Sequence, residues 1–318
     1  MRITLKDIAE KTGYSISTVS RVLTGANNIS LQTRRQILAE AEKSGYTIHS
    51  RNVAIIVENP YFIGYSGVML QAISHELLAN NYNPMIIQID KIDCLNEIPL
   101  CGIMSVLSEN TLAKNWSKTH QYPLISLNTM SKHLDNIYRV ASNEKQGMEM
   151  IVKMLVDAGH TRIARFGGIL DTELSQENYS TNYRNRIFDS LVEQYGLEKN
   201  MQIDSTFEYN VILERISILL TRKPTALIIQ SEDCLLQVLH ALRLLQVRIP
   251  EDLSVVAWNY PHIQNHIHPM ISGISQNYEQ IAKCGCQMLN QLNDGIFPQN
   301  DIEVDYIPLI GTSIKNLK

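Results

Sequence analysis

Apolar residues near the start of the chain recur at helical spacing in three separate runs. The first run covers residues 5–9 and ends at Gly13, the second covers residues 16–23, and the third covers residues 31–43. Serines directly before the second and third runs can cap these helices. Two short helices that meet at a glycine-containing turn, followed by a supporting helix, predict a helix-turn-helix domain over residues 1–46.

The rest of the chain alternates short apolar runs with helical patterns. Strand-like runs include VAIIV from residue 53, TALIIQ from residue 225 and LSVVAW from residue 253. This alternation predicts parallel sheets covered by helices, and roughly 265 residues are enough for two lobes of this kind. The predicted fold class is α/β, with a small all-α N-terminal domain in front of a two-lobed body. Gly167 and Gly168 follow a strand but lack the spacing of a nucleotide-binding loop.

Charge is distributed unevenly between these two parts. Residues 1–50 carry seven Lys and Arg against four Asp and Glu, a net charge of +3, although the whole chain has a net charge of −4. A basic head on an acidic body is typical of a nucleic-acid-binding module joined to a second function. The apolar content of 44% excludes a disordered acidic chain or a low-complexity polymer.

Neither a membrane span nor a metal site is predicted. No stretch approaches the roughly 18 consecutive apolar residues of a span, and the first ten residues have no apolar signal core, so we expect a cytoplasmic protein with reduced cysteines. Cys284 and Cys286 fall on different faces of one predicted helix, which favours packing over a redox or metal pair. His262, His266 and His268 form an H-x3-H-x-H pattern, but no carboxylate or thiolate joins them, which favours surface histidines.

The second predicted helix carries the residues best placed to contact DNA. A recognition helix presents its first residues to base edges in the major groove, so Ile16 and Ser17 are the predicted readers, with Ile16 contacting a thymine methyl. Arg21 lies one turn further on, within reach of a guanine or a phosphate. The other predicted DNA-binding positions, several of them hydroxyls or amides suited to phosphates, are Thr4, Ser15, Thr18, Ser20, Asn27 and Tyr46. The alternative is a small helical cap with a solvated face.

The residues from Thr4 to Tyr46 resemble the DNA-binding head of the LacI/GalR family of bacterial transcription regulators. The segments TLKDIA and STVSRVL and the closing GY carry this resemblance. In the body, NPYF from Asn59, AGHTRIA from Ala158, PTA from Pro224 and IPEDLSVV from Ile249 resemble further motifs of the family. The resemblance therefore covers essentially the whole chain.

The resemblance implies a two-lobed body like that of periplasmic sugar-binding proteins. Lobe 1 would cover about 53–141 and 277–297, and lobe 2 about 142–274 and 300–318. The chain would cross between the lobes three times, and the lobes would close around a ligand. This region would also form the dimerisation surface of the protein.

One departure from the family concerns the link between head and body. Family members carry a hinge that folds into a helix on the operator and inserts a leucine into the minor groove. Here only residues 47–52 separate Tyr46 from the strand that begins at Val53. Six extended residues reach at most about 20 Å, too short for a helix with flexible arms, so we expect a strap. Minor-groove readout by a leucine is then not expected, and Ile48 is a weak substitute.

The resemblance also places effector-binding residues in the body. The predicted set is Tyr61, Phe62, Ser142, Arg184, Glu232, Trp258, Asn259 and Tyr278. Arg184 takes the place of an arginine that clamps sugar hydroxyls; the alternative is a surface salt bridge. Ser142 and Asn259 replace two family aspartates and Glu232 replaces an asparagine, so the ligand should differ from those of the best-known members. For the aromatic residues Trp258 and Tyr278 the alternative is packing within a lobe.

Together these observations predict a transcription regulator, in the first instance a repressor of a carbohydrate-utilisation operon. It would bind a near-palindromic double-stranded operator as a homodimer and respond to a small sugar or glycoside, without cofactor, metal or catalytic residues. Three alternatives remain. The first is a sugar sensor that has lost operator specificity with its hinge. The second is an enzyme that uses the body as a substrate clamp. The third is an activator or a regulator that needs a corepressor protein.

Overall fold

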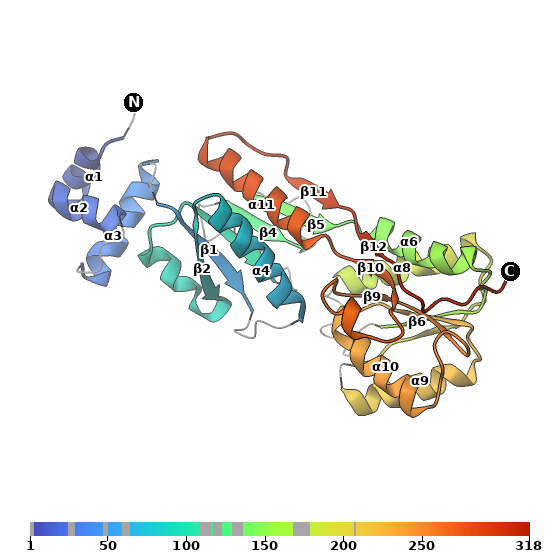
Figure 1. The fold of residues 1–318 in the computed structure, drawn as a ribbon. Helices are drawn as coiled ribbons and strands as arrows, with labels where there is room; N and C mark the ends of the chain where they lie inside the picture. Colours follow the sequence, from blue (N-terminus) through green and yellow to red (C-terminus); the bar gives the residue numbers. More distant parts are fainter. Residues whose placement is uncertain are drawn as a thin grey trace. The chain divides into compact units, whose positions relative to one another are not determined.

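The computed structural model describes residues 3–24, 29–46, 50–58, 64–107, 116, 123–128, 136–167, 179–206 and 208–318. The chain forms two compact units (Figure 1). Unit 1 comprises Met1–Ala141 and Tyr278–Ile302, and unit 2 comprises Ser142–Asn277 and Glu303–Lys318. The predicted architecture, a helical N-terminal head followed by a two-lobed α/β body, is confirmed. Within the described residues, no helix combines the length and apolar character that crossing a bilayer requires.

Three helices form the head: α1 (Leu5–Thr12), α2 (Ile16–Leu23) and α3 (Leu31–Lys43). Each begins at a hydroxyl side chain that accepts a hydrogen bond from the first turn, namely Thr4, Ser15 and Ser30. Gly13 ends α1 with a φ of 74°, a left-handed conformation that glycine adopts without strain, and this allows the tight turn into α2. The buried apolar core between the helices contains Ile8, Ala9, Val19, Val22, Leu23, Ile37, Leu38 and Ala41.

Unit 1 also contains the first lobe, a six-stranded sheet in the order β11-β5-β4-β3-β1-β2. Its strands are β1 (Asn52–Val57), β2 (Asn83–Gln88), β3 (Gly102–Val106), β4 (Leu124–Leu127), β5 (Ile137–Ser142) and β11 (Asp301–Val304).

Strands β1 to β5 pair in parallel. The 3-10 segment η1 (Ile89–Glu97) follows β2. Buried Arg139 on β5 donates from Nε to Asp301 Oδ1 at 2.7 Å, which ties β11 to the sheet.

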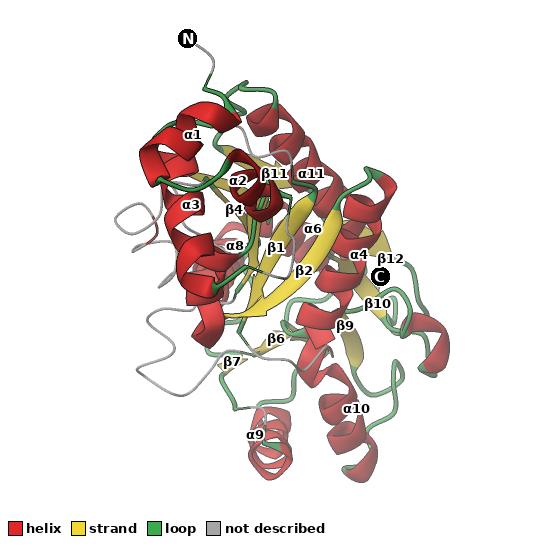
Figure 2. Ribbon diagram, turned by 90° about the vertical axis from the view of Figure 1, so that its left-hand side faces the viewer, coloured by secondary structure: helices red, strands yellow, loops and turns green. Residues whose placement is uncertain are grey.

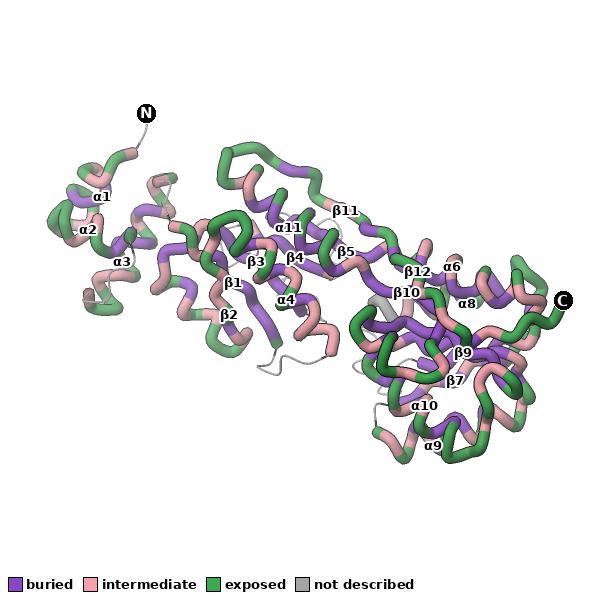
Figure 3. Tube along the Cα trace, in the orientation of Figure 1, coloured by how far each residue is buried: buried purple, intermediate pink, exposed green. Residues whose placement is uncertain are grey.

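Helices α4 (Gly64–Ala79) and α11 (Tyr278–Asn293) pack against each other and against this sheet (Figure 2). The close fit depends on Gly102 in β3, because a Cβ there would lie only 2.1 Å from Cδ1 of Leu289 on α11. The inner strands β1, β3, β4 and β5 are buried along nearly their whole length (Figure 3), as expected of a parallel sheet with both faces covered, whereas the edge strands β2 and β11 are largely open.

Unit 2 holds the second lobe, with the strand order β12-β10-β9-β8-β6-β7. Its strands are β6 (Ile163–Phe166), β7 (Gln202–Ile203), β8 (Ala226–Ile229), β9 (Ser254–Trp258), β10 (Ser272–Ser275) and β12 (Ile307–Leu309). Its helices are α6 (Glu144–Asp157), α8 (Tyr179–Gln194), α9 (Tyr209–Thr221) and α10 (Leu235–Leu244), with the 3-10 segments η2 (Glu232–Cys234) and η3 (Gln264–His266). Only β12 runs antiparallel to its neighbour, β10, among the pairings described.

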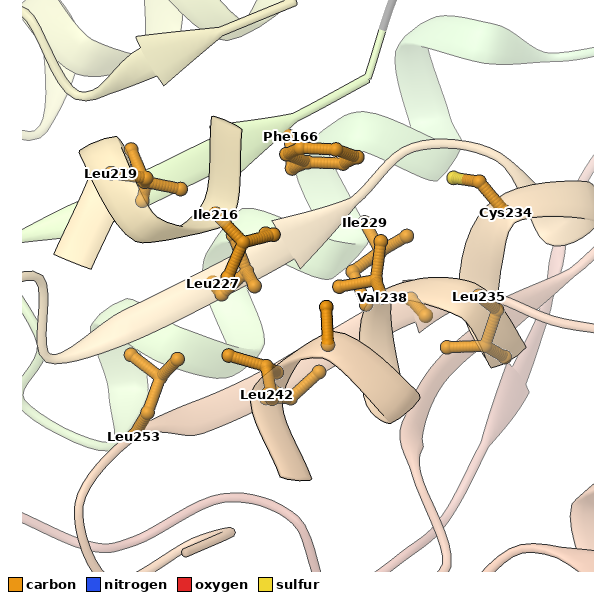
Figure 4. Close-up of a cluster of buried hydrophobic side chains, with 14 of the residues drawn as sticks. Phe166, Ile216, Leu219, Leu227, Ile229, Cys234, Leu235, Val238, Leu242 and Leu253 are labelled. Carbon is orange, nitrogen blue, oxygen red and sulfur yellow. The ribbon is translucent and has the colours of Figure 1, made fainter. Parts of the chain in front are cut away.

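Alternate residues of these strands enter two separate cores. Leu227 and Ile229 of β8 pack with α9 and α10, as Figure 4 shows, whereas Ala226 and Ile228 pack on the other face with α6 and α8. The two-residue period and the apolar character of both faces explain why the strand sequences are nearly continuous apolar runs. Because β6, β8, β9 and β10 are parallel, their carboxyl ends lie at one edge of the sheet, where open α/β sheets bind ligands.

Candidate DNA-binding surface and effector site

Helix α2 exposes the residues predicted to read DNA. Val19 and Val22 are fully buried in the head, while Ile16 is 50% exposed, and Ser17 and Arg21 are also exposed. An isoleucine half open to water at the first position of a helix leaves apolar surface available to a partner. The predicted readers therefore share one accessible face, the arrangement that major-groove contact requires.

The hydroxyl residues of the head cap its helices. Ser15 Oγ accepts from the Thr18 backbone N–H at 3.1 Å and lies 2.9 Å from Ser17 Oγ. Thr4 donates from its backbone N–H and its hydroxyl to Asp7 Oδ2, at 2.8 and 2.7 Å, and these hydrogen bonds hold the pKa of Asp7 below its usual value. These residues thus fix where the helices begin, and contact with phosphates stays a prediction.

The remaining predicted DNA-binding positions of the head are either half-buried or outside the described residues. Ser20 is half-buried, and Tyr46 is half-buried against the head's apolar core. Asn27 lies outside the described residues, as does Ile48 of the strap. Strand β1 begins at Asn52, and the described strap residues Ser50 and Arg51 are not helical.

In lobe 2, Arg184 lies at the centre of a buried polar network. Its Nε and Nη2 donate to Glu144 Oε2 and Oε1 at 2.6 and 3.0 Å, Nη1 donates to the Gln230 backbone oxygen at 2.8 Å, and Nη2 donates to the Tyr306 hydroxyl at 2.9 Å. The guanidinium carbon also lies 4.8 Å from the centre of the Trp258 ring. Arg184 and Glu144 are both buried, so the alternative of a surface salt bridge is wrong.

This network uses most of the hydrogen-bonding capacity of Arg184. Four of its five N–H groups donate to described residues of lobe 2, and within that part of the chain one N–H on Nη1 has no acceptor. Burial opposes the positive charge, but Glu144, Tyr306 and Glu232 together more than compensate and hold the pKa of Arg184 well above its usual value. Burial likewise raises the pKa of the Tyr306 hydroxyl. If Arg184 is to bind a sugar with two hydrogen bonds, its hydrogen bonds to Glu144 would have to break.

A second chain of polar side chains links three residues of unit 2, namely Ser142 at the end of β5, Gln276 after β10 and Glu232 after β8. The Ser142 hydroxyl donates to Gln276 Oε1 at 3.0 Å, and Gln276 Nε2 donates to Glu232 Oε1 at 3.0 Å. All three residues are buried, and burial raises the pKa of the Glu232 carboxyl although Arg184 and Gln276 act in the opposite direction. The predicted residues Ser142 and Glu232 are thus brought together by Gln276, which the sequence analysis missed. Its one sequence signal is its place directly after the strand that ends at Ser275.

Gln230 is a second polar residue that the sequence analysis missed. Only 2% of it is exposed, its Oε1 accepts from Arg165 Nη1 at 3.3 Å, and its Nε2 has no hydrogen-bond partner among the residues that the structure describes. Arg165 Nη1 also donates to Asp204 Oδ1 at 2.9 Å. A buried amide donor without a partner is costly, and a ligand oxygen would satisfy it.

The other predicted effector residues lie in different surroundings. Asn259 is fully buried, and its side chain donates to Gln264 Oε1 at 2.8 Å and accepts from the Tyr260 N–H at 2.8 Å, so it organises the loop after β9. Trp258 is also fully buried and meets Tyr306 edge-on, with ring centres 6.1 Å apart. These contacts support packing roles for both residues, and an effector contact stays a prediction.

The last predicted positions belong to the other unit or are not described. Tyr278 is in unit 1, where it is buried and its ring lies 6.3 Å from that of Tyr65. Tyr61 and Phe62 lie outside the described residues. The five cysteines are free thiols, and no group of three metal-ligating side chains converges in the part of the chain that the structure describes.

Comparison with known proteins assigns both parts of the chain. Residues 4–48 match the bacterial regulatory proteins of the lacI family, and residues 152–312 match the periplasmic binding protein-like domain. The chain belongs to the LacI family. It is thus a transcription regulator with a helix-turn-helix head and a periplasmic-binding-protein-like sensing body, in a family of regulators rather than enzymes.

Individual relatives are distant but match over nearly their whole length. The chain is 24% identical to the probable HTH-type transcriptional repressor ExuR of Bacillus subtilis (strain 168) over 91% of both chains. It is 22% identical to the ribose operon repressor of Haemophilus influenzae, again over 91% of both. Among solved structures, the lac repressor dimer bound to operator and the anti-inducer ONPF gives a TM-score of 0.71 at 17% identity, covering 99% of this chain and all of that one. The regulator CelR in complex with cellobiose gives a TM-score of 0.69 at 18% identity, over 98% of this chain and all of that one.

Proposed function

We propose that this LacI-family protein is a repressor that binds a near-palindromic operator as a homodimer and responds to a small sugar or glycoside. The observation that carries the DNA-binding part is the open face of α2, on which Ile16, Ser17 and Arg21 are exposed above a buried apolar side. The net charge of +3 on the first fifty residues adds attraction to phosphates. Relatives named as repressors support repression rather than activation.

The polar network of lobe 2 supports a hydroxyl-rich effector. Ser142, Gln230, Glu232 and Gln276 offer both donors and acceptors near one edge of the sheet, and Arg184 is neutralised by Glu144. Sugar hydroxyls can donate and accept, so they can complete such a network without leaving a buried group unpaired. A relative of similar fold was solved with cellobiose, which agrees with a sugar or glycoside.

The first experiment is selection of bound sequences from a random duplex pool by the full-length protein, at moderate salt, with and without a panel of neutral sugars and glycosides. A near-palindromic motif supports a dimeric operator-binding regulator, and the sugar that abolishes or sharpens it identifies the effector. Affinity for the recovered operator should fall steeply as salt rises, because each head displaces counterions from several phosphates.

The second candidate is a sugar sensor without operator specificity, and the short strap of residues 47–52 favours it. This candidate predicts binding of a sugar, seen as a rise in melting temperature, together with recovery of no DNA motif. Recovery of a motif would rule it out.

A further inference from the structure

The head contacts lobe 1 through helix α3 rather than through the recognition helix. Arg35 of α3 donates from Nε to Glu97 Oε1 at 3.1 Å, and its Nη2 pairs with the same oxygen. Arg34 Nη1 donates to the Glu97 backbone oxygen at 3.3 Å. Two consecutive arginines of the head thus bind one residue at the end of η1, and Figure 1 shows α3 beside this part of the first lobe.

The strap is attached two residues further along the same segment. The Ser50 hydroxyl donates to the Pro99 backbone oxygen at 2.6 Å, and Asn52 Nδ2 donates to that oxygen at 3.2 Å. The Ser50 hydroxyl also accepts from the Asn52 N–H at 3.0 Å. Glu97 to Pro99 therefore receives hydrogen bonds both from the head and from the strap that follows it.

Apolar side chains lie beside these polar contacts. The groove between α3 and η1 is lined by Leu38 and Ala39 from the head and by Leu95 and Ile98 from the lobe. The exposed face of α2 takes no part in this contact, and Ile16 keeps half of its surface open. The docked head is therefore presented to solvent with its predicted reading residues accessible, so this contact does not occlude them.

We propose that Glu97 is a positioning residue, which holds the head on lobe 1 and takes over the task that the hinge helix performs in other members of the family. The Arg34 and Arg35 contacts fix α3 relative to the lobe and do not depend on the residues that join the head to β1. A head with fixed orientation loses less rotational entropy on binding DNA, and a movement of lobe 1 reaches it directly. The link to DNA affinity rests on the proposed function, whereas the docking itself does not.

Hydrogen exchange of the full-length protein tests the docking without DNA or effector. We expect Glu97→Ala to accelerate amide exchange in peptides covering residues 31–46 and 89–99 by about two- to fivefold, the range for loss of a partly exposed ion pair. Peptides from lobe 2 should exchange unchanged. The matched control is Asp90→Ala, which removes another η1 carboxylate that pairs with Lys91 instead of the head.

A charge exchange separates docking from general loss of stability. Arg35→Glu alone should accelerate exchange as Glu97→Ala does, and the double variant Arg35→Glu/Glu97→Arg should return it to within about twofold of the original rate. Equal exchange in the Glu97→Ala and Asp90→Ala proteins, or failure of the double variant to recover, would overturn the proposal.

The effect of docking on DNA binding is measured with the operator recovered by selection from the random duplex pool. We expect Glu97→Ala to weaken operator binding about three- to tenfold and Asp90→Ala to leave it unchanged. If Glu97→Ala accelerates amide exchange but leaves operator affinity unchanged, the head docks on lobe 1 but docking does not position it for DNA. That result would overturn the positioning role and leave the docking intact. If the protein bound no DNA motif at all, the exchange data would still decide whether the head docks.

Discussion

Glu144 lies forty residues before Arg184 in the chain, yet its carboxylate holds the guanidinium with two hydrogen bonds, from Nε to Oε2 at 2.6 Å and from Nη2 to Oε1 at 3.0 Å. Both groups are buried, and Tyr306 donates to the same Oε2 at 3.0 Å. Such two-point pairing fixes α8 against the start of α6. The arginine expected to clamp a ligand thus first shapes lobe 2 itself.

The first prediction concerns the stability of this lobe. Glu144→Ala leaves the Arg184 charge buried without its carboxylate, and it should lower the free energy of unfolding by about 3–5 kcal/mol. Urea unfolding followed by circular dichroism measures this loss. The double variant Glu144→Leu/Arg184→Met should lose less than Glu144→Ala does, since it leaves no unpaired charge. As a control, Asp157→Ala removes the carboxylate of an exposed pair with Lys153 on the same helix and should leave stability unchanged. Equal losses in the two single variants would contradict this account.

The second prediction concerns the pH dependence that Glu232 causes. Burial raises the pKa of its carboxyl above the usual 4.5, so the folded state binds this proton more tightly than the unfolded state does. The resulting contribution to stability is fully present below pH 4.5 and is lost as pH rises through the folded pKa. Glu232→Gln should remove this dependence and flatten the curve of melting temperature against pH above 4.5. Parallel curves for the two proteins would show that the carboxyl does not titrate in this way.

The architecture could be predicted from the sequence because it depends on local signals. The three head helices have hydroxyl caps and a glycine turn, and the strands of the body are continuous apolar runs, so both follow from residues close together in the chain. The partners of Arg184 could not be predicted this way. Glu144, Gln230 and Tyr306 lie 40, 46 and 122 residues from it, and the folded sheet alone brings them together.

The contrast between local signals and long-range contacts also explains why the sequence analysis missed Gln276 and Glu97. Gln276 is one of many glutamines in the chain, and its role depends on Ser142 lying 134 residues away. Glu97 has no neighbouring motif, and its contact with Arg35 spans 62 residues. The family resemblance points to positions that bind ligand in relatives, whereas both of these residues act through contacts between residues far apart in the chain.

The third prediction tests how Arg21 contributes to DNA binding. This residue is exposed on α2, as Ile16 is, and a bidentate arginine contact to guanine provides roughly 1–3 kcal/mol of discrimination. Arg21→Ala should therefore weaken binding to the selected operator about tenfold or more and weaken binding to unrelated duplex much less. Electrophoretic mobility shift titrations on both duplexes measure the ratio. An equal loss on both, with a smaller salt dependence, would assign Arg21 to a phosphate instead.

The last prediction tests whether the strap transmits the ligand signal. Ser50 and Asn52 of the strap donate hydrogen bonds to the Pro99 oxygen, and Arg35 of the head donates to Glu97. We expect the head to move together with lobe 1 only while the strap is short enough to keep these contacts formed. Insertion of six Gly and Ser residues after Tyr46 lengthens the connection by up to about 20 Å. The exposed Arg35–Glu97 pair, worth at most about 1 kcal/mol, is then left to hold the head without a short connection, so the head detaches and moves independently. The variant should keep its sequence preference, because the reading face of α2 is unchanged, but the identified effector should no longer alter its operator affinity. The matched control inserts the same residues after Lys199, in the exposed turn between α8 and β7 of lobe 2, and should keep the response. An unchanged response in the strap variant would mean that the signal reaches DNA by another route, such as a change in dimer geometry.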